Sequence, residues 1–374
     1  MIRILYLTQG MGVGGTEKQL LHLLRSLDRT RFAPTLAVFS ADGVLRAAFE
    51  EAAVPIINLG FRQPLLQYRN RTGLLEFLKL LHAGQFSIVH SLLYHPNVLA
   101  AVCGRCAGIR HIVLSERNLG YFHKGFHRLV ARVVYRLADS VTTNSNPAGK
   151  FLLECKMATP RKLVVIPNGI PLPPISGCPS AMAAARQTFG LPPTGPVVAT
   201  LGRFAPIKGH AHFVAACAIV AQRFPNVTFA LAGEGASRET LLKQTTALGL
   251  TSRIRFVGQV DDPAAFLVGL DAFVLPSLSE AMSNALMEAM AAARPIVATA
   301  VGGNVELIEH ERTGLLVPPA DPSALAEAIC TLLGDPERGR CLGQAARAKI
   351  ESYSIERMVT RTTELYERLL HSPV

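Results

Sequence analysis

The chain opens with a stretch that indicates its fold class: Ile2-Arg-Ile-Leu-Tyr-Leu-Thr8, then a glycine-rich loop ending in Gly14-Gly15, then a leucine-rich run to Leu27. The β-rich run predicts a strand over 2–8, and the spacing of the leucines predicts an amphipathic helix over 16–27. The same alternation continues along the first half, with strands predicted at 35–39, 55–59, 87–90, 111–115, 140–143 and 163–166. Alternating strands and helices are typical of a mostly parallel sheet with helices on both faces.

A cluster of helix breakers interrupts this alternation. Pro171, Pro173, Pro174, Gly177 and Pro179 fall within nine residues, which favours an interdomain linker. The α/β pattern then restarts, with strands predicted at 197–201, 228–232, 254–257, 272–275, 295–298 and 314–317. We therefore expect two doubly wound, Rossmann-like domains, over 1–170 and 171–354, whose strand ends face one crevice where ligands bind.

The composition favours a folded protein without disulfides. Of 374 residues, 49% are hydrophobic and 17% charged, so burial can outweigh the ordering entropy. The seven cysteines are scattered, which fits a reducing cytoplasm, and Cys103 and Cys106 are interpreted as buried thiols. The N-terminus is interpreted as a strand and not a signal peptide, and apolar runs are shorter than the ~20 residues of a spanning helix. We expect a soluble or peripheral protein.

The net charge of +11 is confined to the first half. Residues 1–170 carry 21 Lys/Arg and 9 Asp/Glu, whereas residues 171–374 carry 17 and 18. This asymmetry fits an anionic surface or substrate on that side, or simply a solvated basic face. Residues 64–82 and 121–136 each combine leucines, valines or phenylalanines with basic side chains. Each is either an interfacial helix at an anionic membrane or a core helix with a basic outer face.

Three loops carry candidate chemistry, and the first follows the first strand. Gly10, Gly12 and Gly15 match the G-x-G-x-x-G pattern of dinucleotide-binding loops, where glycines let the backbone approach a bound group. The acidic residue expected at the end of the second strand is poorly placed, because Asp42 lies 27 positions past Gly15. The loop alone is weak evidence for a nicotinamide cofactor.

The second loop is Leu201-Gly-Arg-Phe-Ala-Pro-Ile-Lys-Gly-His210, after the first strand of the second domain. Arg203 offers a bidentate fork and Lys208 a compact charge, a pair suited to a diphosphate. The alternative is two ordinary surface cations.

The third loop is the most informative: Leu275-Pro-Ser-Leu-Ser-Glu-Ala-Met-Ser-Asn-Ala-Leu-Met-Glu288. A helix beginning near Ser283 places Glu280 before its N-terminus and Glu288 about one turn inside. Both carboxylates can then contact one ligand beside free N–H groups that can donate hydrogen bonds to a phosphate. Alternatively, Glu280 complements the helix dipole and Glu288 faces solvent. The apolar neighbours of Glu288 favour a bound hydroxyl as its partner.

Together these loops resemble the retaining glycosyltransferases of family 4, which have the GT-B fold. The similarity also includes Val165-Ile-Pro-Asn-Gly-Ile170, Gly233-Glu-Gly235, Val301-Gly-Gly-Asn-Val-Glu306 and Gly314-Leu-Leu-Val317, and it covers nearly the whole chain.

The resemblance implies a role for each matching residue. Arg203 and Lys208 would bind the donor diphosphate, Glu280 the transferred sugar and Glu288 the ribose hydroxyls. The remaining donor contacts would come from the backbone of Met282, Ser283 and Asn284 and from a loop closing at Gly14 and Gly15. It further implies retention of configuration, no cofactor, no metal, and a C-terminal helix over about 355–374 that packs back on the first domain.

The acceptor side departs from the family pattern. Ala281 stands where glycine is common, and Arg117 lies near the position where many members have a histidine. His90 and His95 are the nearest substitutes, although a lone histidine at a strand end is more often structural.

We expect transfer from a UDP- or GDP-sugar to a glycan or lipid-linked acceptor in cell-surface polysaccharide or glycolipid synthesis, in the cytoplasm or on the inner membrane face. Rival interpretations are a sugar-nucleotide epimerase or phosphorylase of the same fold, a nicotinamide-dependent oxidoreductase, and a non-catalytic basic protein. A phosphorylase would need a pyridoxal lysine setting that the sequence does not display. The oxidoreductase leaves Arg203, Lys208, Glu280 and Glu288 unexplained, and no motif supports binding to nucleic acid.

Overall fold

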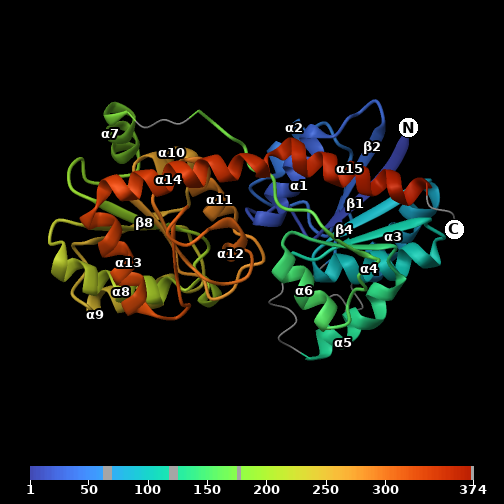
Figure 1. Cartoon of the computed structure of the whole chain (residues 1–374). Helices are drawn as coiled ribbons and strands as arrows, with labels where there is room; N and C mark the ends of the chain where they lie inside the picture. Colours follow the sequence, from blue (N-terminus) through green and yellow to red (C-terminus); the bar gives the residue numbers. More distant parts are fainter. Residues whose placement is uncertain (62–69, 118–124, 175–177, 372–374) are drawn as a thin grey trace. The chain divides into compact units, whose positions relative to one another are not determined.

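The computed structural model describes residues 1–61, 70–117, 125–174 and 178–371. The chain divides into two compact units (Figure 1). Unit 1 is Met1–Gly169 with Ile355–Val374, and unit 2 is Ile170–Ser354. The sequence-based boundaries, 170/171 and 354/355, lie beside these divisions.

Unit 1 is built on a seven-stranded sheet whose neighbouring strands are all parallel. Its strand order is β3-β2-β1-β4-β5-β6-β7, so the direction of winding reverses between β1 and β4. The strands are β1 (Ile2–Thr8), β2 (Phe32–Val38), β3 (Ile56–Asn58), β4 (Ile88–Leu92), β5 (His111–Ser115), β6 (Ser140–Thr143) and β7 (Leu163–Val165). The helices are α1 (Gly15–Ser26), α2 (Arg46–Glu51), α3 (Arg71–Ala83), α4 (Tyr94–Cys106), α5 (Gly125–Val134), α6 (Asn146–Glu154) and α15 (Ile355–His371), with a 3₁₀ turn at Tyr135–Leu137.

Unit 2 repeats the plan with a six-stranded parallel sheet in the order β10-β9-β8-β11-β12-β13. Here the winding reverses between β8 and β11. The strands are β8 (Val197–Leu201), β9 (Thr228–Ala232), β10 (Ile254–Gly258), β11 (Ala272–Leu275), β12 (Ile296–Thr299) and β13 (Leu315–Val317). The helices are α7 (Pro179–Thr188), α8 (His210–Arg223), α9 (Arg238–Ala247), α10 (Pro263–Val268), α11 (Asn284–Ala291), α12 (Asn304–Leu307), α13 (Pro322–Gly334) and α14 (Pro336–Ile350), with 3₁₀ turns at Pro206–Lys208 and Glu351–Tyr353.

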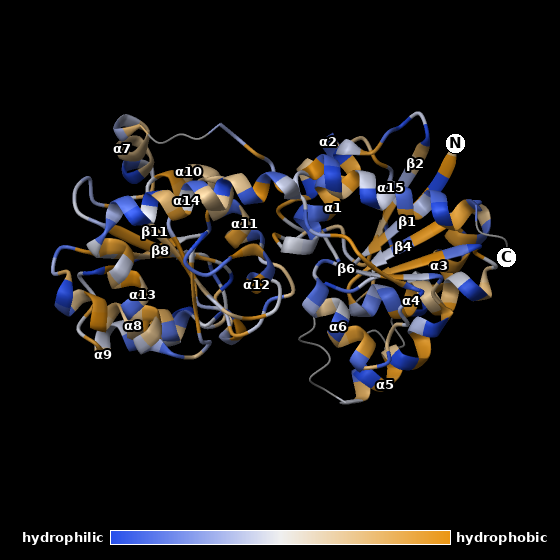
Figure 2. Ribbon diagram, in the orientation of Figure 1, coloured by the Kyte–Doolittle hydropathy of each residue, from blue (hydrophilic) through white to orange (hydrophobic). Residues whose placement is uncertain are grey.

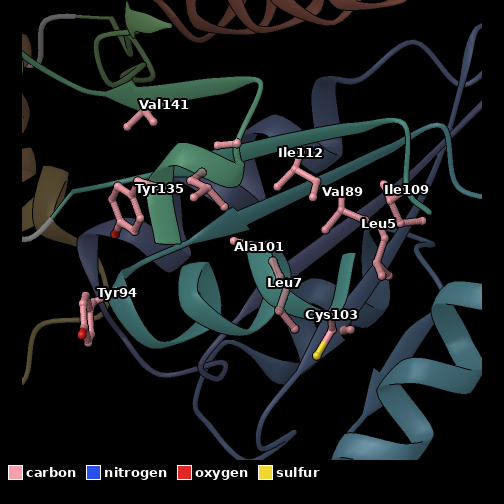
Figure 3. Packing of buried hydrophobic residues seen from close by; sticks show 14 of the residues in the cluster. Leu5, Leu7, Val89, Tyr94, Ala101, Cys103, Ile109, Ile112, Tyr135 and Val141 are labelled. Carbon is pink, nitrogen blue, oxygen red and sulfur yellow. The ribbon is translucent and has the colours of Figure 1, made fainter. Parts of the chain in front are cut away.

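Each sheet lies at the centre of its unit, and the hydrophilic residues lie on the loops and on parts of the surrounding helices, which also carry hydrophobic residues (Figure 2). In unit 1, Leu5 and Leu7 of β1 belong to one buried cluster with Val89 and Ile112 of the adjacent strands (Figure 3). Cys103 of α4 also packs into this cluster, but Cys106 is exposed, so the expectation that both thiols are buried was wrong for Cys106. The two thiols lie about one turn apart on the same side of α4, and Cys106 is exposed at the last residue of the helix.

The predicted fold class is confirmed: both sheets are parallel and doubly wound. Most strand predictions agree with the structure to within a residue or two, because buried parallel strands are continuous apolar runs. The linker prediction holds only to Pro174 within the described residues, since Pro179 begins α7. Parts of two predicted amphipathic segments, residues 64–69 and 121–124, lie outside the described residues.

Helix α15 is tied to unit 1 through a buried polar network. The Tyr366 hydroxyl lies 2.9 Å from the Tyr6 hydroxyl of β1 and 2.6 Å from His90 Nδ1 of β4. His90 Nε2 lies 2.8 Å from Ser115 Oγ of β5, and Ser115 in turn hydrogen-bonds Thr142 of β6. One side chain from the end of the chain therefore connects to four successive strands of the sheet.

Removing the bridging hydroxyl should weaken unit 1. Tyr366→Phe leaves His90 Nδ1 and the Tyr6 hydroxyl without their shared partner, and a buried polar group left unsatisfied costs about 1–3 kcal/mol. We expect the free energy of unfolding, measured in urea, to fall by this amount. Arg361→Ala, at an exposed position of the same helix, should change it by less than about 0.5 kcal/mol. Equal stability of Tyr366→Phe and the unaltered protein would contradict the network's importance.

Candidate active site

The clearest candidate site lies in unit 2, where the winding of the sheet reverses. The loops after β8 and β11 leave neighbouring parallel strands at this point, the usual ligand position in such sheets. The first loop carries Arg203 and Lys208, and the second carries Glu280. Topology therefore brings together two motifs that are 72 residues apart.

Lys208 and Glu280 form a close ion pair. Lys208 Nζ lies 2.6 Å from Glu280 Oε1, and Ser277 Oγ donates to the same oxygen at 2.7 Å. Glu280 is 8% exposed, so these two donors compensate a carboxylate that has lost most of its water. The ammonium is partly accessible, with 28% of its side chain exposed. The pair can thus offer a positive charge to an anionic ligand.

Glycines hold this pair in position by close backbone packing. Gly209 has a φ of +66°, and a Cβ there would lie 1.9 Å from the Pro276 carbonyl oxygen. Gly302, with a φ of +45°, would place a Cβ 1.6 Å from the Glu280 carbonyl oxygen. The Leu278 N–H also donates to Ile207 O at 2.8 Å. The Lys-Gly and Gly-Gly motifs therefore let three loops pack against one another.

The loop that carries Arg203 is also held by close backbone packing at glycines. It is exposed, and it lies between Gly202 and Phe204. A Cβ at Gly233 would lie 2.0 Å from Gly202 O, and one at Gly235 would lie 2.5 Å from Phe204 O. The Gly-Glu-Gly segment thus packs closely against the backbone on both sides of Arg203.

The helix after the third loop begins where the sequence predicts. Ser283 is the N-cap of α11, its Oγ accepting from Leu286 N at 3.3 Å, and Asn284 is the first helical residue. Met282 and Ser283 are buried, whereas Asn284 is half-buried. Glu288 is half-buried and has a partner within the structure, so the sequence argument from an unpaired charge does not hold. Its assignment to the donor rests on the family resemblance alone.

In unit 1, the glycine loop ends beside the carboxylate of Glu17. Gly14 is the N-cap of α1, and a Cβ there would lie 2.1 Å from Oε2 of Glu17 in the first turn. Gly15, the first helical residue, is exposed. Neither glycine has a positive φ, and a Cβ at Gly14 would meet only the end of the flexible Glu17 side chain, which can move aside, so the local geometry does not require glycine at position 14.

The candidate acceptor residues lie in different environments. His90 is buried with both ring nitrogens engaged, and burial lowers its pKa to about 3, which favours the structural alternative. His95 is half-buried, with Nδ1 3.2 Å from Gln9 Nε2, and burial and nearby His127 lower its pKa. Arg117 Nη1 donates to Asn168 Oδ1 at 2.9 Å, and burial lowers its pKa to about 10. The guanidinium of Arg117 also contributes, after burial, to the lowered pKa of His90.

Sequence reasoning missed several residues around these positions. Glu116 is completely buried at the end of β5 and accepts from the Tyr135 hydroxyl at 2.7 Å. Gln19 exchanges two hydrogen bonds of 2.8 Å with the backbone of Gly169. His210, after Lys208, is buried against Phe204, and burial lowers its pKa to about 4. Glu116 lies between Ser115 and Arg117, and Gln19 follows Lys18, so neither burial has a local signal in the sequence.

Within the described parts of the chain, no group of three or more histidine, cysteine, aspartate or glutamate side chains could hold a metal ion. No described helix is long and apolar enough to cross a membrane.

Comparison with known proteins places this geometry in a family. The profile "Glycosyltransferase Family 4" matches residues 13–172, and "Glycosyl transferases group 1" matches residues 195–335. The structure of Anabaena Alr3699/HepE in complex with UDP-glucose superposes with a TM-score of 0.86 at 25% identity, covering 98% of this chain and 100% of that one.

Two curated relatives match over shorter stretches. The D-inositol 3-phosphate glycosyltransferase of Salinispora arenicola is 32% identical over 244 residues, 61% of this chain and 54% of the relative. The lipopolysaccharide core biosynthesis glycosyltransferase LpsE of Rhizobium meliloti is 32% identical over 213 residues, 57% and 58% of the two chains. The match thus spans little more than half the length of these relatives.

Two parallel Rossmann-like units with a cationic loop at the switch point of the second define a protein of the GT-B fold class. The two profiles together cover most of the chain, and the chain belongs to glycosyltransferase family 4.

The buried neutral histidines predict a pH dependence of stability. His90 and His210 have folded pKa values of about 3 and 4, below the ordinary 6.5, so the unfolded chain binds more protons as pH falls through 6.5. Their contribution to stability is complete above pH 6.5 and is lost towards the folded pKa values. The loss is at most about 1.4 kcal/mol per pH unit for each histidine.

We expect His90→Gln to take up about one proton fewer on unfolding between pH 5 and pH 6. Unfolding free energies measured across this range provide the slope. Thr360→Ser, at an exposed position of α15, removes no titrating group, so it serves as the control and should leave the slope unchanged. An unaltered slope in His90→Gln would show that this imidazole titrates normally in the folded protein.

Proposed function

We propose that the protein is a retaining glycosyltransferase that moves a sugar from a nucleotide-diphosphate donor to a glycan or lipid-linked acceptor. The Lys208–Glu280 pair, held at the switch point of unit 2 beside the start of α11, carries this proposal. A UDP-sugar is the donor to test first, because a structural relative of 25% identity is described in complex with UDP-glucose. A GDP-sugar is the alternative donor.

The donor's diphosphate would replace Glu280 as the principal partner of Lys208. Arg203 would add a second cation, and the N–H groups at the start of α11 would add partial positive charge. Glu280, released from the ammonium, would accept hydrogen bonds from the sugar. Glu288 would do so for the ribose, and the backbone of Met282, Ser283 and Asn284 would contact the sugar or the phosphate.

The chemistry would then be leaving-group stabilisation and positioning. The bond between the sugar's anomeric carbon and the diphosphate breaks with its electron pair going to the nucleoside diphosphate. An acceptor hydroxyl forms the new bond on the same face, and its proton passes to the departing phosphate. Fixed cations aimed at the developing negative charge lower the barrier without bound metal or cofactor.

The acceptor would bind on unit 1, with Gly14 and Gly15 near the donor diphosphate and His95 and Arg117 as candidate contacts. His90 would act indirectly, because its ring nitrogens already bind Tyr366 and Ser115. The names of the relatives, which refer to inositol phosphate and to lipopolysaccharide core, support a polyhydroxylated or glycolipid acceptor in cell-surface synthesis.

Nucleotide binding should depend on the unit 2 cations. We expect UDP, GDP or their sugars to raise the melting temperature, and Arg203→Ala or Lys208→Ala to lose most of this increase, because each removes a charge from the diphosphate site. Glu288→Ala should weaken binding through the ribose. Lys243→Ala, at an exposed position of α9, is the matched control and should retain the full shift. Stabilisation by NAD in place of any of these nucleotides would support an oxidoreductase instead.

Turnover then distinguishes transfer from isomerisation. With a responsive nucleotide sugar and a glycan acceptor, NMR should detect a glycoside with the donor's anomeric configuration, and an excess of EDTA should leave the rate unchanged. Lys208→Ala should lower kcat at least about 100-fold, the scale measured for loss of one transition-state charge contact. Epimerised nucleotide sugar without an acceptor product would favour the epimerase of the same fold. Inverted product or loss of activity in EDTA would contradict the proposed mechanism.

We further infer that unit 1 contacts the inner face of an anionic membrane. Phe126, Leu129 and Val133 of α5 share one helix face and are 69%, 59% and 60% exposed. This outward face is apolar, whereas an ordinary core helix would present its basic side. Exposed apolar side chains in a unit rich in lysine and arginine fit an interfacial helix.

Membrane binding should therefore require these three side chains. We expect the protein to float with phosphatidylglycerol vesicles at low salt, and a Phe126→Ser, Leu129→Ser, Val133→Ser variant to remain at the bottom of the gradient. Leu248→Ser, which removes an exposed leucine from unit 2, should float normally. Equal flotation with uncharged phosphatidylcholine, or no flotation at all, would contradict the inferred anionic surface.

A further inference from the structure

A second candidate site lies in unit 1, at the β3 edge of the sheet and beside the loop after β1. A pocket of about 430 Å³ opens between α2, the edge strand β3 and the loop after β1. Its size falls within the range of small-molecule sites. Its lining includes Met11, Arg46, Glu50, Val54, Ile56 and Asn58.

The pocket offers both hydrogen-bond donors and acceptors without net charge. Arg46 Nε lies 2.9 Å from Glu50 Oε1, one turn later on α2, so the two charges offset each other. Asn58 Oδ1 accepts a hydrogen bond from Gly60 N at 3.1 Å. This contact fixes the orientation of the side-chain amide and leaves its NH₂ group to donate to a ligand. A guanidinium, a carboxylate and an amide can together bind vicinal hydroxyls. A strongly anionic ligand would meet Glu50 unfavourably.

The other lining residues are apolar. Val54 is buried and Ile56 half-buried, and Met11, which belongs to the glycine loop, is fully buried. Hydrocarbon surface beside a few polar groups suits a pyranose, whose ring carries C–H groups on its faces and hydroxyls around its edge.

The pocket is also joined to the glycine loop by its backbone. Leu45 N donates to Met11 O at 2.9 Å, and Ser40 N donates to Gln9 O at 3.2 Å. Gly43 has a φ of +150°, and a Cβ there would lie 2.2 Å from Met11 O. The loop leading into α2 is therefore packed directly on the loop that contains Gly14 and Gly15.

We propose that the Arg46–Glu50–Asn58 pocket binds a neutral sugar unit of the acceptor, separate from the unit that receives the transferred sugar. This inference rests on the proposed function, because it takes unit 1 as the acceptor side. The ligand is an uncharged polyhydroxylated ring, and the acceptor is recognised at a position beyond its reacting hydroxyl.

Methionine methyl NMR on the full chain provides the test. The chain contains eight methionines, and Met11 reports on the pocket floor while Met287 is buried in unit 2. We expect at least one of four methyl glycosides (glucoside, galactoside, mannoside or N-acetylglucosaminide) to move the Met11 signal saturably without nucleotide. The Met287 signal should stay in place. Met11→Leu assigns the signal.

Variants of the polar pair make the test specific. Glu50→Gln and Arg46→Gln should each weaken the Met11 response about tenfold, the equivalent of about 1.4 kcal/mol and of one lost hydrogen bond to a charged group. Glu154→Gln is the matched control, because Glu154 lies one turn from Lys150 on exposed α6 of the same unit. Its response should equal that of the unaltered protein.

Three results would overturn the proposal: no glycoside moves Met11, the Glu50→Gln response is unchanged, or inorganic phosphate moves Met11 more strongly than any glycoside. UDP binding is measured separately by the melting temperature. UDP binding without a Met11 response would support the proposed function and contradict this pocket. A Met11 response without UDP binding would support the pocket and contradict the proposed donor site.

Discussion

The ion pair between Lys208 and Glu280 is the interaction around which the candidate site in unit 2 is organised. A carboxylate that is 8% exposed is costly unless donors surround it, and the lysine and Ser277 supply them at 2.6 and 2.7 Å. Because both partners stand on loops, the pair keeps its geometry only if the loops are fixed. The close backbone approaches at Gly209 and Gly302 provide this, and they explain why glycine is required at both positions.

Unit 1 has the same topology, but its buried polar side chains bind one another and not a ligand-facing charge. In the described part of its sheet, His90, Ser115 and Thr142 hydrogen-bond one another, and Tyr366 completes the chain from α15. These side chains stiffen the frame without offering a charge to a ligand. The contrast follows from the residue types: a neutral imidazole and hydroxyls can satisfy each other completely, whereas an ammonium at a loop retains capacity for further acceptors.

The sequence was sufficient for the fold and for the choice of motifs, and insufficient for their partners. Strands 2–8, 111–115 and 140–143 were predicted with their observed bounds because short runs of apolar or β-branched residues are a local pattern. The pairing of His90 with a tyrosine 276 residues later has no local signal. The same holds for the outward apolar face of α5.

Charge balance also constrains how the unit 2 site can work. A diphosphate and the Glu280 carboxylate would compete for one ammonium, so Lys208 alone could not hold both. In the proposed complex, Arg203 and the N–H groups at the start of α11 would supply the additional positive charge that this competition requires. Binding of the anion would then free a fixed carboxylate beside the bound sugar, coupling recognition of the diphosphate to orientation of the group to be transferred. The buried, neutral His210 fits this arrangement, because a third permanent cation beside Lys208 would make the loop costly to hold together before any ligand arrives.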